Sequence, residues 1–162
     1  MLAGVGDVLF DRGDLDGARK SYQESLSLRK QVGEKQTVAE TELALARLFL
    51  EEKQGNDAET VIRKCKEEFH QDQEADDELA AGVALVNAFL GEGKNLEAAK
   101  EVEDAKSLVA KSVNELIRLE FDIVSARVES GSGDLESSRR QLQSALQKVA
   151  LITYLGWSSK LA

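Results

Sequence analysis

The side chains best suited to catalysis in this chain are one thiol and one imidazole. Cys65 is the only cysteine, which rules out an internal disulfide, and His70 is the only histidine. A thiolate acts as a nucleophile when a base lies within hydrogen-bond reach. Cys65, however, has Ser25 and Ala105 as its counterparts 40 residues to either side. That pattern is typical of a small buried residue, so we interpret Cys65 as core and His70 as an exposed residue near a helix end.

The acidic segment at residues 71–78, QDQEADDE, is the strongest candidate for metal binding. Its alternating acids match the first ligands of a calcium-binding EF-hand loop. The place of the turn glycine, however, holds Asp77, and the place of the last carboxylate ligand holds Val83. We therefore predict no calcium site and interpret the segment as a solvated connection between helices.

Other short motifs are equally incomplete. Gly4 and Gly6 begin a G-x-G, but no third glycine follows and no strand is expected before them. Ser27 and Lys30 have S-x-x-K spacing in mid-helix, without the companion motifs of a serine acylase. We predict no catalytic residues, no cofactor and no metal, so the chain itself is not expected to be an enzyme, although a parent protein could carry an enzymatic domain such as a Ser/Thr kinase.

The composition of the chain also narrows the kinds of partner that it is expected to bind. The chain has 162 residues, 30 of them acidic and 21 basic, for a formal net charge of −9. Nucleic-acid binders need a basic surface, so nucleic acid is not an expected partner. No apolar run approaches the ~20 residues that cross a bilayer, and no basic leader opens the chain. We expect no membrane partner and a cytoplasmic location.

A 40-residue repeat organises the sequence. Small residues recur at this step, with Val86 as the one larger member, and so do apolar residues, with Glu129 as the one exception. The small columns are Gly6, Ala46, Val86 and Ala126; Ala18, Ala58, Ala98 and Ser138; and Ser25, Cys65, Ala105 and Ala145. The apolar columns are Tyr22, Ile62, Val102 and Leu142; Val8, Leu48, Ala88 and Val128; and Leu9, Phe49, Phe89 and Glu129. Small residues at fixed intervals allow two helices to approach closely.

Each unit is predicted to hold two helices, joined by a turn that carries Gly with Asn or Asp. The expected N-caps of the second helices are Asp14, Asn56, Asn95 and Asp134, and capping boxes are expected at Asn56/Glu59, Thr37/Glu40 and Ser112/Glu115. Longer connections are expected near 31–37, 70–77 and 110–114. The expected helices span 2–12, 15–32, 38–53, 57–70, 78–91, 96–110, 113–129 and 135–150, with a separate ninth segment at 154–162 whose Trp157 covers the end of the last helix pair.

The pattern resembles the tetratricopeptide repeat (TPR) family, whose signature places Leu-Gly, an aromatic residue, Ala and a second aromatic at fixed offsets. The first unit matches best, with Val5-Gly6, Leu9, Ala18 and Tyr22. The resemblance implies an all-α, right-handed α-solenoid of one domain over 1–162, with repeats at 1–33, 34–73, 74–112 and 113–152 and a cap or further repeat at 153–162. The usual repeat has about 34 residues and ends in Pro. This one is longer, has no Pro, and is similar to the longer TPR variety of adaptors and bacterial signalling regulators.

The resemblance also implies a function. TPR proteins bind other proteins in a groove lined by the first helix of each unit, so we expect a non-catalytic interaction module within a larger signalling or regulatory protein. Carried over position by position, the groove residues are Asp7, Leu43, Arg47, Leu50, Val83, Asn87, Leu90, Ile123 and Arg127. The two arginines favour an acidic, partly apolar peptide as ligand. The alternatives are a HEAT-like or TPR-like scaffold and self-association through the repeat ends. The sequence does not name the partner.

Overall fold

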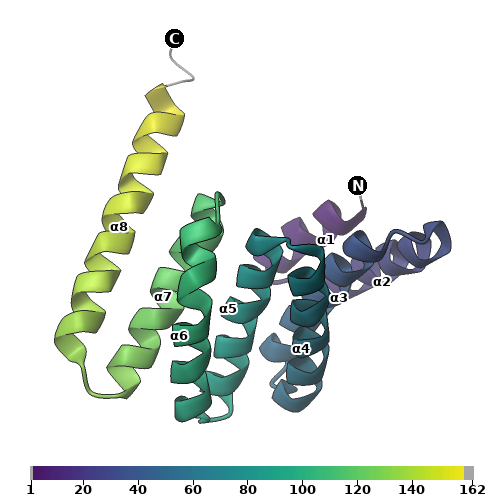
Figure 1. Ribbon diagram of the computed structural model, residues 1–162. Helices are drawn as coiled ribbons and strands as arrows, with labels where there is room; N and C mark the ends of the chain where they lie inside the picture. The colour runs from purple at the N-terminus through teal and green to yellow at the C-terminus, as the bar shows by residue number, and fades with distance from the viewer. Residues whose placement is uncertain (1, 159–162) are drawn as a thin grey trace.

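The computed structural model describes the backbone of residues 2–158 and, within that range, the side chains except those at 2, 56 and 152–158. The described residues form eight α-helices and no strand (Figure 1). The helices are α1 (Leu2–Asp11), α2 (Leu15–Val32), α3 (Lys35–Glu51), α4 (Gly55–Asp72), α5 (Ala75–Gly91), α6 (Asn95–Lys111), α7 (Glu115–Gly131) and α8 (Leu135–Ser158). The all-α prediction is confirmed, and none of these helices is long and apolar enough to span a membrane.

Five of the eight helices are longer than expected, and the connections between the first three units are shorter. α2 has the expected bounds, but α4 extends two residues further at each end than the predicted 57–70, and only residues 33–34 and 73–74 separate the flanking helices. Gly33 and Gln73 adopt left-handed φ angles of 83° and 61° there, which reverses the chain within a single residue. Residues 154–158 continue α8 and do not begin a ninth helix. The expected role of the Trp157 side chain lies outside the described residues.

The turn inside each hairpin repeats its geometry every 40 residues. Residues 13, 53, 93 and 133 all have left-handed φ angles, between 61° and 90°. The next residue in each turn donates its backbone N–H to a carbonyl five residues earlier, as Asp14 does to Leu9 at 2.9 Å and Lys94 to Phe89 at 2.8 Å. This pattern of bonds closes the C-terminus of a helix and favours glycine at the left-handed position. Three of the four turns have glycine there, and the second has Lys53.

Two of the four expected N-caps are confirmed. The carboxylates of Asp14 and Asp134 accept backbone N–H groups at 3.0 Å from Gly17 and Ser137. α4 and α6 instead begin one or two residues earlier than expected, after Gln54 and Lys94, neither of which makes a side-chain cap. The residue before each second helix repeats every 40 positions, at 14, 54, 94 and 134, so Asn56 and Asn95 lie two residues and one residue past it, inside helices.

The expected capping boxes before α3 and α7 are also displaced. α3 begins after Glu34, so Thr37 lies within the helix, where its hydroxyl donates to the Glu34 carbonyl at 3.1 Å. α7 is capped by Asn114, whose side chain accepts from Leu116 and Ile117. The Ser112 hydroxyl instead donates to Asp76 of α5, which ties the α6–α7 connection to the preceding hairpin.

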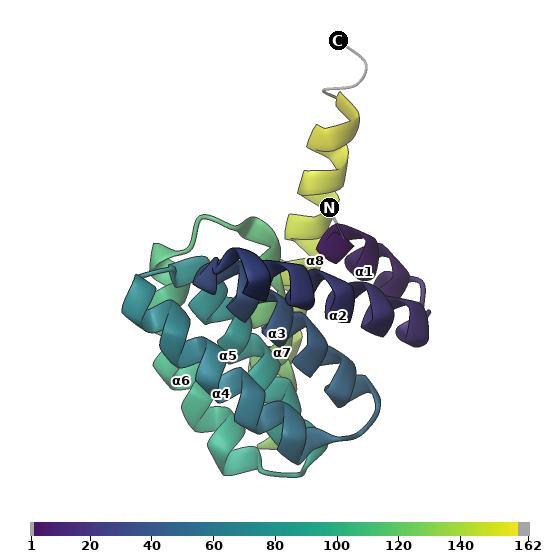
Figure 2. The same ribbon diagram turned by 90° about the vertical axis from the view of Figure 1, so that its right-hand side faces the viewer.

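The helices pack in two layers. Each helix packs on the next along the chain, and the odd-numbered helices α1, α3, α5 and α7 also contact one another in order. The even-numbered helices form an outer layer, in which the Lys66–Glu101 ion pair links α4 to α6. Figure 2 shows the α1–α2 hairpin crossing in front of the helices behind it, turned relative to them.

The small residues of the repeat are buried at the helix contacts. Ala18, Ala58 and Ala98 are each 0% exposed, and Ser138, their counterpart in the last unit, is 6% exposed. The Gly6, Ala46, Val86 and Ala126 column is also buried throughout. The apolar columns are buried or partly buried in the two middle units, but in the end units Val8 is 51% exposed and Leu142 is 40% exposed, although Tyr22 is buried. Most of the core therefore lies in α3 to α7.

Gly6 shows why a small residue is needed at these contacts. The buried ring of Tyr22 lies against its Cα so closely that a methyl group at position 6 would overlap the ring. Gly4, on the same helix, has no neighbouring atom within 4 Å of the place a Cβ would take.

We expect Gly6→Ala to destabilise the protein by ~1–3 kcal/mol, because the buried Tyr22 ring would have to move. Gly4→Ala is the matched control and should stabilise α1 by up to ~1 kcal/mol through its higher helix propensity. Urea unfolding followed by circular dichroism measures both changes. Equal effects of the two substitutions would contradict the assigned contact between α1 and α2.

Candidate peptide groove

Two adjoining cavities lie on the face formed by the odd-numbered helices. The first has a volume of about 460 Å³ and is lined by residues of α1, α2, α3, α5 and α7, together with the cap residue Asn114. The second has a volume of about 350 Å³ and is lined by α1, α3, α5 and α7. Phe10, Arg47 and Glu120 line both, so the two cavities join into one groove across this face. We call this surface the inner groove.

Seven of the nine groove residues expected from the sequence line the inner groove. They are Asp7, Leu43, Arg47, Leu50, Val83, Asn87 and Arg127. The other two lie outside its walls: Leu90 is partly buried against the core, and Ile123 is 39% exposed. Val83, the counterpart of Ile123 in α5, lines the groove, so the transfer of this position from the third unit to the fourth was wrong.

Sequence reasoning missed several residues of the groove. Phe10 and Glu120 contribute to both cavities, and Glu40, Asp77 and Ile117 line the first. Glu40 and Glu120 lie three residues before the expected positions Leu43 and Ile123, so a search of the i+3 neighbours could have found them. Asp77 and Ile117 lie near the starts of α5 and α7, further from the expected positions. Phe10 comes from the first unit, where no preceding unit indicates which face it takes.

Both arginines expected in the groove already have partners. Arg47 of α3 pairs with Glu120 of α7 at 3.5 Å. The Arg127 guanidinium donates a hydrogen bond to the side-chain oxygen of Asn87. These contacts join α3 to α7 and α5 to α7 across the groove. Both arginines are therefore held in place, and Glu120 offsets the charge of Arg47, whereas the neutral Asn87 leaves the charge of Arg127.

The end of the inner groove near α1 is acidic and partly buried. Five carboxylates line the first cavity beside a single cation, Arg47; they belong to Asp7, Asp11, Glu40, Asp77 and Glu120. The Tyr22 hydroxyl donates to Asp7 at 2.8 Å. Burial, together with this hydrogen bond to a carboxylate, raises the pKa of Tyr22, so the phenol stays protonated and fixes the position of Asp7.

Two of these carboxylates repel each other. Burial raises the pKa of Glu40, and the negative charge of Asp77 raises it further, whereas Arg29 opposes the change. Burial likewise raises the pKa of Asp77, with Glu74 and Asp76 adding to the effect and a hydrogen bond from Gln36 opposing it. A cation placed between these carboxylates would favour their ionised forms.

Neither Cys65 nor His70, the side chains best suited to catalysis, lines the inner groove. Cys65 is 0% exposed, and burial raises the pKa of its thiol to about 12, so the core interpretation is confirmed. The His70 side chain is 68% exposed at the end of α4, with Nδ1 3.1 Å from Glu78 Oε1, as expected. Among the described residues, no cluster of three potential metal ligands occurs.

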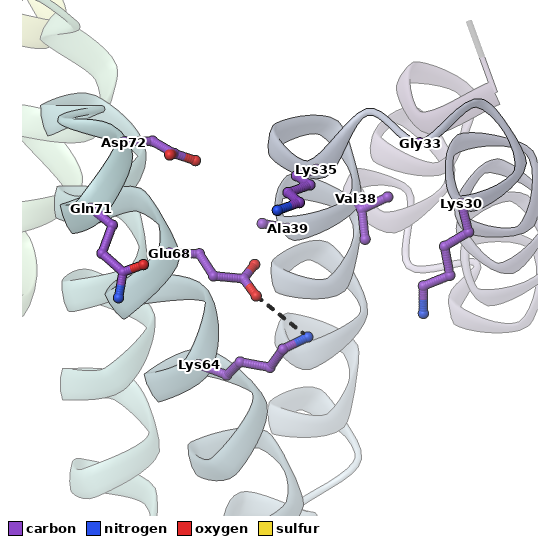
Figure 3. Close-up of a pocket in the computed structure, with 9 residues that line it drawn as sticks. All are labelled: Lys30, Gly33, Lys35, Val38, Ala39, Lys64, Glu68, Gln71 and Asp72. Carbon is purple, nitrogen blue, oxygen red and sulfur yellow. Dashed lines mark ion pairs between the residues drawn. The ribbon is translucent and has the colours of Figure 1, made fainter.

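A further cavity of about 520 Å³ lies between the end of α2, the start of α3 and the end of α4. Figure 3 shows Lys30, Lys35 and Lys64 around it, with an ion pair between Lys64 and Glu68. Lys30 and Lys64 both also pair with Glu42, at 2.9 and 2.8 Å. These pairs neutralise most of the positive charge, so this cavity is a weaker candidate than the inner groove.

Glu40→Gln should raise the melting temperature at neutral pH. Because the folded state raises the pKa of Glu40 above its ordinary value of 4.5, this group's contribution to stability is complete below that pH and is lost as pH rises through the folded-state pKa. The amide keeps an acceptor for Arg29 and removes the repulsion. The difference between variant and wild type should close as the pH falls below 4.5. Asp104→Asn, at an exposed site on α6, is the control and should change little. A Glu40→Gln variant that melts with the wild type at neutral pH would show that the repulsion is negligible.

Comparison with models of known protein families and with curated proteins found no match to this chain.

Proposed function

We propose that the chain is a non-catalytic module that binds a peptide or helical segment of another protein in the inner groove. The observation that carries this proposal is the convergence of α1, α3, α5 and α7 on two adjoining cavities. A groove of this length, with apolar walls and a few fixed polar groups, suits an extended or helical segment.

The architecture we propose for it is a right-handed α-solenoid of TPR type. Its support is the 40-residue recurrence of left-handed turn residues, buried small residues and contacts between successive odd-numbered helices. In such an architecture each added unit extends the same groove. We further propose that the module serves within a larger signalling or regulatory protein, and this step rests on the resemblance alone.

The charge of the groove favours a basic ligand over the acidic one suggested by the sequence. Six carboxylates and two arginines line the two cavities, and both arginines are engaged by Glu120 and Asn87. A lysine or arginine of the ligand would lie among carboxylates whose mutual repulsion it relieves. Apolar ligand residues would pack on Leu50, Phe10 and Val83.

Self-association is the second candidate function, supported by the outer surface of α8. Leu135, Leu142 and Leu146 share one face of this helix and are 66%, 40% and 68% exposed. A second protein surface could cover this face. Sedimentation equilibrium separates the candidates, since self-association predicts a mass that rises with concentration.

Selection of a displayed peptide library against the chain should yield segments that contain lysine or arginine. Glu120→Lys should weaken their binding at least ~10-fold, because it adds positive charge where the two cavities meet. Glu24→Lys, the same charge change at an exposed site of α2, should leave binding unchanged. Fluorescence anisotropy measures the affinity, which should fall as salt rises. Peptides that bind both variants like the wild type would place the binding site elsewhere.

A further inference from the structure

Three crevices lie between the outer helices, each lined also by the odd-numbered helix between them. α2 and α4 flank α3, α4 and α6 flank α5, and α6 and α8 flank α7 (Figure 1). Because the chain repeats every 40 residues, each position in one crevice has counterparts in the others. The three crevices differ at the end where α3, α5 and α7 terminate.

In the first two crevices, a cation of the chain itself lies over a phenylalanine ring. In the first, the guanidinium carbon of Arg19 lies 5.6 Å from the ring centre of Phe49, and the side chain pairs with Glu52. In the second, the guanidinium carbon of Arg63 lies 5.3 Å from the ring centre of Phe89. Such a cation is stabilised by the electron-rich face of the ring.

A second cation reinforces the middle crevice. The Lys94 ammonium lies 5.9 Å from the ring centre of Phe89 and pairs with Glu59 at 2.8 Å. Both crevices are thus filled at this end by the protein's own basic side chains.

The third crevice has none of these groups. Its counterpart of Phe49 and Phe89 is Glu129, a carboxylate in place of a ring. The counterparts of the three cations Arg19, Arg63 and Lys94 are, in order, Ala99, Glu103 and Asp134. At each of these positions one of the earlier crevices carries a cation, whereas the third carries a small residue and two further acids.

The missing side chains leave a cavity of about 510 Å³ between α6, α7 and α8. Apolar side chains form much of its wall, among them Val102, Phe121 and Val128. The wall also carries two ion-paired groups, since Lys106 pairs with Glu103 and Asp122 pairs with Lys148, both at 2.6 Å.

Three buried oxygen atoms in the wall of this cavity have no hydrogen-bond partner among the described residues. They are Ser125 Oγ, Glu129 Oε2 and Gln141 Oε1. Ser125 is only 5% exposed, and its counterparts are Leu45 and Leu85, so the polar group is particular to this unit. The Gln141 amide donates to the other oxygen of Glu129 at 2.6 Å, which leaves its own carbonyl oxygen free to accept. Leaving such atoms unpaired out of water is costly.

We propose that this cavity binds an arginine side chain of a partner protein, in the place that Arg19 and Arg63 occupy in the first two crevices. A guanidinium carries five N–H donors in one plane, which suits three acceptors that lack donors. Its positive charge complements Glu129, and its alkyl stem matches the apolar wall of Val102, Phe121 and Val128. This site is on the outer layer and is separate from the inner groove.

The test uses N-acetyl-L-arginine N-methylamide as the probe and the corresponding citrulline compound as its uncharged isostere. Titration of the whole chain, followed by nuclear magnetic resonance, should shift the Gln141 side-chain amide and the backbone amides around Ser125 and Glu129 in a saturable way. A probe of this size is expected to bind with a dissociation constant on the order of millimolar. The citrulline compound should bind at least ~10-fold more weakly, because it lacks the charge.

Two variants test the internal comparison. Glu129→Gln should weaken binding of the arginine probe at least ~10-fold. Ala99→Arg places a guanidinium at the counterpart of Arg19, and should both raise the melting temperature and block the probe. Ala99 is exposed, so this variant is expected to fold. Ala110→Arg, at an exposed site of the same helix outside the cavity, is the control and should bind the probe like the wild type.

The proposal is overturned if the citrulline compound binds equally well, or if Glu129→Gln leaves the affinity unchanged. It is also overturned if the shifts appear around Arg47 and Asn87, which would place the probe in the inner groove. Failure here leaves the groove proposal intact, because that proposal is tested by Glu120→Lys and not by these variants.

Discussion

The close approach of neighbouring helices is the constraint on which the rest of the structure depends. Ala18, Ala58 and Ala98 are fully buried, and at Gly6 the ring of Tyr22 takes the space a side chain would need. Because dispersion and hydrophobic contacts between helices depend on this approach, a large residue in any of these columns would separate a hairpin from its neighbour. The inner groove exists because successive odd-numbered helices pack directly against one another. The outer crevices exist because the even-numbered helices lie further apart from each other.

The repeat made the helices predictable, and the caps were predictable only in part. A 40-residue period averages the evidence from four units, so even weak signals locate each helix to within a few residues. Asn56 and Asn95 were wrong as N-caps because the N-cap position keeps the 40-residue register of Asp14, at which Gln54 and Lys94 stand. Glycine marks three of these turns, but Lys53 and Gln73 adopt the same backbone shape without a sequence signal. Backbone strain of this kind is visible only once the chain is folded.

The candidate groove was predictable in its residues and not in its charge. Position-by-position transfer found seven of its lining residues. It considered the arginines in isolation, whereas Arg47 lies beside Glu120, which is 73 positions later in the chain. The electrostatic character of a surface is a sum over elements that meet only in three dimensions. The acidic groove end and the hollow third crevice are both of this kind, since each depends on three or four helices at once.

The single thiol makes the opening of the stack measurable as chemistry. Cys65 lies in α4, near the middle of the helical array, and is closed to solvent on all sides. A reagent that modifies thiols can reach it only when α4 separates from its neighbours. When that separation and its reversal are fast compared with the chemical step, the modification rate reports the equilibrium population of the opened form and therefore its free energy. The rate of modification of the Cys65 sulfur therefore measures local unfolding of this part of the protein without an added label.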